Sequence, residues 1–212
     1  MKPPAPRRPR QSPCGTPPPT CHGSESSCTS AGTGATLVAL VDDYIARVRP
    51  RHAAGRKFDR SHKDLATAIS FAALALTPEL SRHAHQRRIP GHALAAADRR
   101  LQRARLGNCI RFSDLHAAVK RVGDAIDGLG ELWTYDTALR IGNWLEREPD
   151  MVYLHSGTRV GARNLGLDHH AASIALEALP AELQQLSPAE CEDFLCIYKD
   201  RLQATARPPT VR

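Results

Sequence analysis

The chain has 212 residues, of which 42% are apolar, 24% are charged and only 5% are aromatic. That length is ample for a hydrophobic core and favours one domain, with or without a tail. No apolar run approaches the roughly 20 residues that a membrane-spanning helix needs, so we expect no membrane association. The first 30 residues also lack the apolar segment of a secretory signal.

The formal net charge of +7 is divided unevenly along the chain. Residues 1–41 carry +3, residues 42–122 carry +10 from 17 basic and 7 acidic side chains, and residues 123–212 carry −6. A basic half is therefore joined to an acidic half. Such a positive excess is more than solubility requires, and it favours nucleic acid as a partner. The alternative is a solvated helix face, or one neutralised by the acidic half.

Eight of the 16 prolines fall in the first 19 residues, where apolar side chains are few. We therefore expect a disordered Pro/Ser-rich tail over residues 1–34. A single helical domain should follow over residues 35–206, divided by charge into a basic half (35–122) and an acidic half (123–206).

The six cysteines form neither a disulfide framework nor a metal site. Cys14, Cys21 and Cys28 recur every seven residues, without the closely paired ligands of a zinc knuckle. We expect no metal and no cofactor. A reduced, cytoplasmic setting follows, associated with the nucleoid if the protein is bacterial, and organellar import is the weaker alternative.

Apolar residues at helical spacing predict the elements of the first half. A stripe from Leu37 to Val48 predicts the first helix, and Ser61 is placed to cap a second helix that runs to Leu76. Thr77-Pro78-Glu79 has the pattern of a cap followed by proline, which predicts another short helix. An arginine-rich helix is expected over 92–106.

The second half continues this pattern with an amphipathic helix from Phe112 to Val122 and another over 133–145. Two more helices are expected over 170–179 and 188–202. The last begins with a capping box, in which Ser187 and Glu190 flank Pro188. Because no stretch alternates like a strand, the predicted fold is all-α, a compact multi-helix domain.

The segment Asp127-Gly128-Leu129-Gly130-Glu131 lies between two of these amphipathic helices. Two glycines around one apolar residue allow a tight hairpin in which Leu129 packs inward. The glycines would expose backbone N–H groups at the start of the next helix, where the helix dipole favours a phosphate oxygen. A hairpin of this kind holds one DNA strand without reading its bases.

Gly128-Leu129-Gly130 followed by Trp133-Thr134 resembles the hairpin of the helix-hairpin-helix DNA glycosylase superfamily. The resemblance extends over about residues 112–166, where Pro149-Asp150 and the Arg159-containing segment look like the part that carries the catalytic aspartate. It implies a helix-hairpin-helix fold, duplex DNA as partner and a role in DNA repair. Together with the polar groups that follow Tyr153, the residues expected to contact DNA are Gly128, Leu129, Gly130, Glu131, Thr134, Ser156, Gly157, Thr158, Arg159 and Arg163.

The active-site residues of that superfamily are not matched. Leu132 stands where lyase members carry a lysine, which excludes Schiff-base chemistry there. The expected aspartate would fall near Leu154 to Ser156, none of which is acidic. His155 and Asp150 are the weak candidates that remain for catalysis, unless Asp136 or Asp168 folds into the pocket.

The polar cluster Tyr153 to Arg159 is predicted to be either a phosphate-binding pocket or a loop whose Ser or Thr caps a helix. His83, His85 and His92 are interpreted as surface residues rather than metal ligands. The leading hypothesis is a DNA-binding protein of glycosylase-like fold that need not have glycosylase activity. The alternatives are an enzyme, a divergent base-excision DNA N-glycosylase, and a helical scaffold that binds a protein partner.

Overall fold

The structure, a computed structural model, describes residues 36–202, and this part of the chain is built almost entirely of helices. The all-α class predicted from the sequence is confirmed. The described residues belong to one compact unit of the chain. The expected tail over residues 1–34, with its three cysteines, lies outside them.

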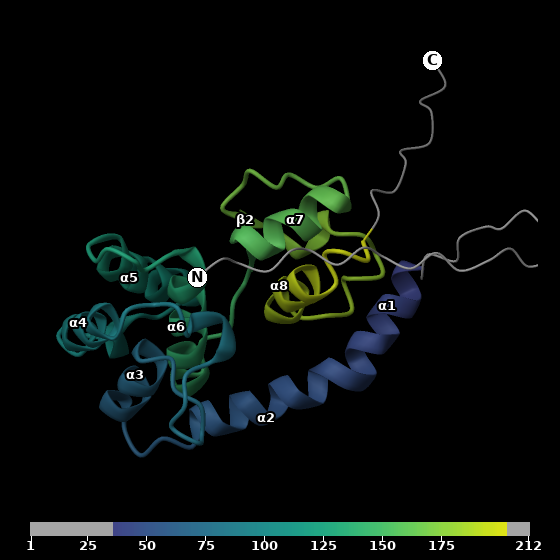
Figure 1. The fold of residues 1–212 in the computed structure, drawn as a ribbon. Coiled ribbons are helices and arrows are strands. Elements are labelled where there is room, and N and C mark those ends of the chain that lie inside the picture. Colours follow the sequence, from purple (N-terminus) through teal and green to yellow (C-terminus); the bar gives the residue numbers. More distant parts are fainter. Residues whose placement is uncertain (1–35, 203–212) are drawn as a thin grey trace, which may run out of the picture. The chain divides into compact units, whose positions relative to one another are not determined.

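The chain begins with one long helical run, drawn in purple and blue in Figure 1. It comprises α1 (Leu37–Asp43), a π-helical turn (Tyr44–Val48) and α2 (Arg49–Arg60). The π-helical turn ends just before Pro50, which has no N–H to donate to the helix ladder. The run therefore continues twelve residues beyond the predicted apolar stripe.

Four helices follow in the middle of the chain: α3 (Leu65–Ala73), α4 (Gly91–Leu101), α5 (Phe112–Asp124) and α6 (Glu131–Leu145). Single 3-10 turns (Ala84–Gln86 and Leu106–Asn108) flank α4. The C-terminal part contains α7 (Ser156–Asn164), a 3-10 turn (Leu176–Ala178) and α8 (Pro188–Ile197). The strands β1 (Val152–Tyr153) and β2 (Ser173–Ile174) pair antiparallel, with Val152 opposite Ile174.

Several predicted helix boundaries and two predicted helices are wrong. Asp64, not Ser61, caps α3 by accepting a hydrogen bond from the N–H of Thr67 (2.8 Å). In place of a helix at 77–79 there is a turn, closed by the Thr77 N–H donating to the Ser81 carbonyl (2.7 Å). In place of a helix over 170–179 there are β2 and a 3-10 turn. The arginine-rich helix α4 ends at Leu101 instead of continuing to residue 106.

The capping box at the start of α8 is confirmed. The N–H of Glu190 donates to Ser187 Oγ (3.3 Å), and the N–H of Ser187 donates to the Glu190 carboxylate (3.0 Å). These two bonds satisfy backbone donors that the helix itself leaves without acceptors. They also fix where the acidic first turn of α8 lies.

Two clusters of buried side chains form the core. One joins the N-terminal helical run to β1, α7 and α8, and contains Tyr44, Phe194 and Leu195. The other joins α3, α4, α5 and α6, and contains Phe112 and Trp133. The clusters do not follow the charge boundary of the sequence, since α1 packs with the C-terminal helices and α6 packs with the basic half. None of the described helices is both long and apolar enough to cross a bilayer.

Candidate functional site

The turn between α5 and α6 is built on two glycines. Gly128 has a φ of +89°, a left-handed conformation that favours glycine. Gly130 is the N-cap of α6, and nothing lies within 4 Å of the position that a Cβ on it would take. No side chain caps α6, so the N–H groups of its first turn have no helical acceptor and lie beside the exposed Glu131. Leu129 packs against the second core cluster.

The basic helix α4 lies beside this turn. Nη1 of Arg100 donates to the carbonyl of Ala125 (3.1 Å), and the ring of Pro90 lies 3.5 Å from the Cβ position of Gly128. The arginines near these contacts are exposed, and none forms an ion pair within residues 36–202. We call this region the hairpin surface; it comprises Gly128 to Glu131 with Arg87, Arg88, Arg99, Arg100 and Arg103.

The start of α7 places its polar residues in different environments. Thr158 is buried and caps the helix, because its hydroxyl accepts from the N–H of His155 (2.7 Å) and donates to the carbonyl of the same residue (2.9 Å). Ser156 is exposed. A Cβ on Gly157 would lie 2.8 Å from the Cys196 sulfur, so this glycine faces α8. Thr158 and Gly157 therefore position α7 and do not present polar groups to solvent.

Arg159 connects α7 with the start of α6. Its guanidinium donates to the carbonyls of His169 (2.9 Å) and Ala171 (2.8 Å) and forms an ion pair with Glu131 (3.3 Å). Two residues predicted to contact DNA are thus brought together, although Arg159 already has three partners. Arg163 is exposed on the same helix, whereas Thr134 of α6 is 5% exposed.

The two catalytic candidates lie in different surroundings. His155 is 2% exposed, and its Nε2 is hydrogen-bonded to Oε1 of Glu192. Asp150 is exposed and lines a cavity of about 330 Å³ beside Arg111 and Arg147. No contact joins the two residues in the part of the chain that the structure describes.

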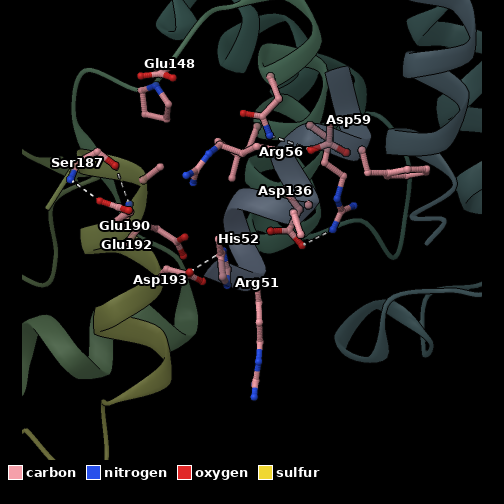
Figure 2. A pocket seen from close by; sticks show the side chains of 18 of the residues that line it. Arg51, His52, Arg56, Asp59, Asp136, Glu148, Ser187, Glu190, Glu192 and Asp193 are labelled. Carbon is pink, nitrogen blue, oxygen red and sulfur yellow. Dashed lines mark hydrogen bonds and ion pairs between the residues drawn. The ribbon is translucent and has the colours of Figure 1, made fainter. Parts of the chain in front are cut away.

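A larger cavity, of about 710 Å³, lies among α2, the 78–85 segment, α6 and α8 (Figure 2). We call it the carboxylate cavity, because its lining includes six carboxyl side chains, from Asp59, Asp136, Glu148, Glu190, Glu192 and Asp193. Three arginines and three histidines line it as well, namely Arg51, Arg56, Arg140, His52, His83 and His85. Its volume is in the range of small-molecule sites.

Most of these carboxylates have partners in the protein. Asp136 Oδ2 accepts from His85 (2.7 Å), Gln86 (2.6 Å) and Arg140 (3.3 Å). Asp193 is bonded to Nδ1 of His52 (2.8 Å), and Arg49 donates two hydrogen bonds to Glu190 (2.8 and 3.1 Å). Glu192, like Asp193, forms an ion pair only with a histidine, and Asp59 accepts only from the side-chain amide of Asn143, so no lysine or arginine in residues 36–202 pairs with any of the three.

The pKa values of the groups that line the cavity are shifted in different directions, depending on the partners of each group. Burial raises the pKa of Glu192 to about 7 and that of Asp59 to about 6. Burial also acts on Asp136, but Arg140 and His85 outweigh it and hold the pKa of that carboxyl below its usual value. The hydrogen bond to Asp193 raises the pKa of His52, and burial lowers that of His83 to about 4.

The sequence did not indicate this cavity, although three of its residues were considered. Asp136 was named as a carboxylate that could fold into a pocket, and it does line the cavity. His85 is exposed, as predicted, and His83 is half-buried; both line the cavity, and their ring centroids lie 6.1 Å apart. Glu192, Asp193 and His52 belong to no recognisable motif, because charged residues like these are common on helix surfaces and only the packing of α2 against α8 brings them to one cavity.

Among residues 36–202, no group of three or more His, Cys, Asp or Glu side chains has an arrangement that could hold a metal ion. Comparison of the chain with protein-family models, curated proteins and solved structures finds no match. Its function is therefore argued from the hairpin surface and the carboxylate cavity.

Proposed function

We propose that this chain binds duplex DNA through the sugar–phosphate backbone, at the hairpin surface. The observation that carries the proposal is the contact between the basic helix and the glycine turn, made by Arg100 with Ala125 and by Pro90 with Gly128. The turn itself belongs to the acidic half of the sequence, so it needs positive charge from another segment. Helix α4 supplies that charge at the place where the N–H groups of α6 are uncapped.

In this proposal the two parts of the surface have different tasks. The backbone N–H groups at Gly130 and Glu131 hold one phosphate at a fixed position. The exposed arginines contribute long-range attraction that does not depend on base sequence. A protein with this task would act in the cytoplasm, at the nucleoid in a bacterium. Base excision lacks comparable support, because His155 is buried and no contact joins it to Asp150.

The test measures fluorescence anisotropy of a labelled duplex of about 20 base pairs across a salt series, with the full chain. Replacing Arg88 and Arg100 with glutamine should reduce the slope of log affinity against log salt by about 2. Arg47→Gln removes one exposed charge from the π-helical turn in the middle of the N-terminal helical run, outside the hairpin surface, and should change the slope little. A wild-type chain that does not bind DNA at low salt would overturn the proposal.

A second pair of variants tests the helix terminus. Gly130→Asp and Gly130→Asn have the same shape, both favour the N-cap position, and the space around Gly130 is open. Both variants should fold, but only the aspartate places a negative charge against the phosphate. We expect affinity to fall about tenfold more for the aspartate than for the asparagine. Equal affinities would show that no phosphate binds at this terminus.

A further inference from the structure

The carboxylate cavity has six carboxyl groups but only three arginines, and no lysine or arginine in residues 36–202 forms an ion pair with Glu192 or Asp59. We propose that it binds a linear diamine or polyamine, whose ammonium groups pair with Glu192 and Asp59. The two carboxyls come from different helices, α8 and α2, so a ligand between them would contact both walls of the cavity (Figure 2).

Glu192 is the stronger of the two observations. It is 6% exposed and lines the cavity, yet only its Oε1 has a partner, the Nε2 of His155. Its Oε2 makes no hydrogen bond to any residue in 36–202. This oxygen is not enclosed by protein atoms, so it opens into the cavity. A ligand ammonium that donates to Oε2 would pair the buried carboxylate with a cation.

Asp59 repeats the pattern on the opposite wall. Its single hydrogen-bond partner within the described residues is the neutral side-chain amide of Asn143 (2.8 Å). The ring of Phe58 and the side chain of Leu139 also line the cavity. Methylene groups of an alkyl amine would pack against these apolar surfaces while its charged ends reach the two carboxyls.

The arginines of the cavity do not reverse this preference. Arg140 is already paired with Asp136 (3.3 Å), and Figure 2 shows Arg51 directed away from the labelled carboxyl groups. Arg51 and Arg56 have no ion pair within the described residues, and Nη1 of Arg140 is buried without a hydrogen-bond partner, so these groups could attract an anion instead. A nucleotide monophosphate is therefore the competing ligand that the experiment must include.

Binding should depend on pH. The titratable side chains that interact with Glu192 come from each element packed around it. They are His155, Asp193, Asp136, Tyr135, His52, His85 and Cys196. Asn143 and Arg140 face Asp59. Burial raises the pKa of Glu192 to about 7 and that of Asp59 to about 6, so both carboxyls are fully charged only above neutral pH. An ammonium group would bind better there and would release protons on binding.

The experiment is isothermal titration calorimetry of the full chain with putrescine and spermidine at about 0.15 M salt, where weak surface attraction is screened. At about pH 8 we expect saturable binding that is about tenfold tighter than at about pH 5.5. Repeating the titration in two buffers of different ionisation enthalpy should reveal proton release near neutral pH. The uncharged analogue 1,4-butanediol should give no binding heat.

Variants separate the cavity from general acidity. Glu192→Gln and Asp59→Asn should each weaken spermidine binding by about tenfold. Glu177→Gln removes the same charge from an exposed position outside the cavity and should leave the affinity unchanged. Thermal unfolding reports whether each variant folds. If Glu192→Gln does not fold, the affinity of Asp59→Asn alone tests the proposal. No binding of either amine, equal weakening by Glu177→Gln, or binding of adenosine monophosphate alone would each overturn the proposal.

Discussion

His155 and Glu192 are joined inside the protein by a hydrogen bond between imidazole Nε2 and carboxylate Oε1. His155 is the N-cap of α7 and Glu192 lies on α8, and neither is more than 6% exposed. The bond therefore links two helices at the inner wall of the carboxylate cavity. His155 was considered as a catalytic group, but its position makes it first of all the partner of Glu192.

The first prediction concerns this pair. His155→Ala leaves Glu192 buried without its partner, which should lower the free energy of unfolding by about 3 kcal/mol or more. Glu192→Gln keeps a hydrogen-bonding group and removes the buried charge, so it should cost at most about 1 kcal/mol. Urea unfolding at about pH 8.5, above the pKa of about 7 that burial gives Glu192, measures both values. Equal losses in the two variants would contradict the idea that the unpaired charge is what destabilises the first.

The second prediction uses the two glycines of the hairpin. Gly128→Ala forces alanine into a φ of +89° and should reduce the free energy of unfolding by about 1 to 2 kcal/mol. Gly130→Ala is the control, since its backbone is extended and its surroundings are open, and it should cost only about 0.5 kcal/mol because alanine is a poorer N-cap residue than glycine. Chemical denaturation of the two variants decides the matter. A loss at Gly130 as large as that at Gly128 would show that the left-handed backbone is not the cause.

The third prediction is a pH dependence that comes from Asp59. Folding raises the pKa of this acid from 3.8 to about 6, so the native state holds the proton more tightly than the unfolded state. Its contribution to stability is complete below about pH 4 and is lost as the pH rises through about 6. The asparagine variant cannot titrate. As the pH rises from about 4 to about 7, the free energy of unfolding of the wild type should therefore fall by roughly 2 to 3 kcal/mol more than that of Asp59→Asn.

Urea unfolding at several pH values between about 4 and 7 tests this difference. Asp42→Asn provides the control, because Asp42 is exposed on α1 and the substitution makes the same charge change. This control should keep the pH profile of the wild type. If Asp59→Asn also keeps that profile, Asp59 is not titrating as its burial requires.

Features of the structure that depend on neighbouring residues in the sequence could be predicted, whereas features that depend on contacts between distant residues could not. The start of α8 was predicted because a capping box is a pattern of four adjacent residues, Ser187 to Glu190. Helix α2 was missed because none of its side chains is buried, so it has no apolar stripe. The pairing of β1 with β2 joins residues 20 and 22 positions apart, and no local pattern at 170–179 indicates it.

The candidate site divides in the same way. The glycine turn could be predicted, since Gly128, Leu129 and Gly130 are contiguous and each has a distinct conformational task. The carboxylate cavity could not, because its walls come from four separate segments, and Asp59 and Glu192 meet it only after those segments pack. Charge counts along the chain also do not predict that the basic helix α4 lies beside the glycine turn of the acidic half. That arrangement depends on the packing of Pro90 against Gly128.

The last prediction tests the contact between α7 and α8. A Cβ on Gly161 would lie 2.2 Å from the backbone carbonyl oxygen of Leu195, far inside any allowed contact. The backbone of α8 cannot rotate away as a side chain can, so Gly161→Ala must separate the two helices and disturb the first core cluster. We expect a loss of about 3 kcal/mol in the free energy of unfolding.

Gly157→Ala is the comparison within the same helix. Its added Cβ would meet the sulfur of Cys196 at 2.8 Å, and that side chain can change rotamer. The loss there should be about 1 kcal/mol. Thermal and urea unfolding of both variants measure the difference. A Gly161→Ala variant as stable as the wild type would mean that α7 and α8 are not packed this closely. The hydrogen bond between His155 and Glu192, which depends on the same contact, would then lose its support.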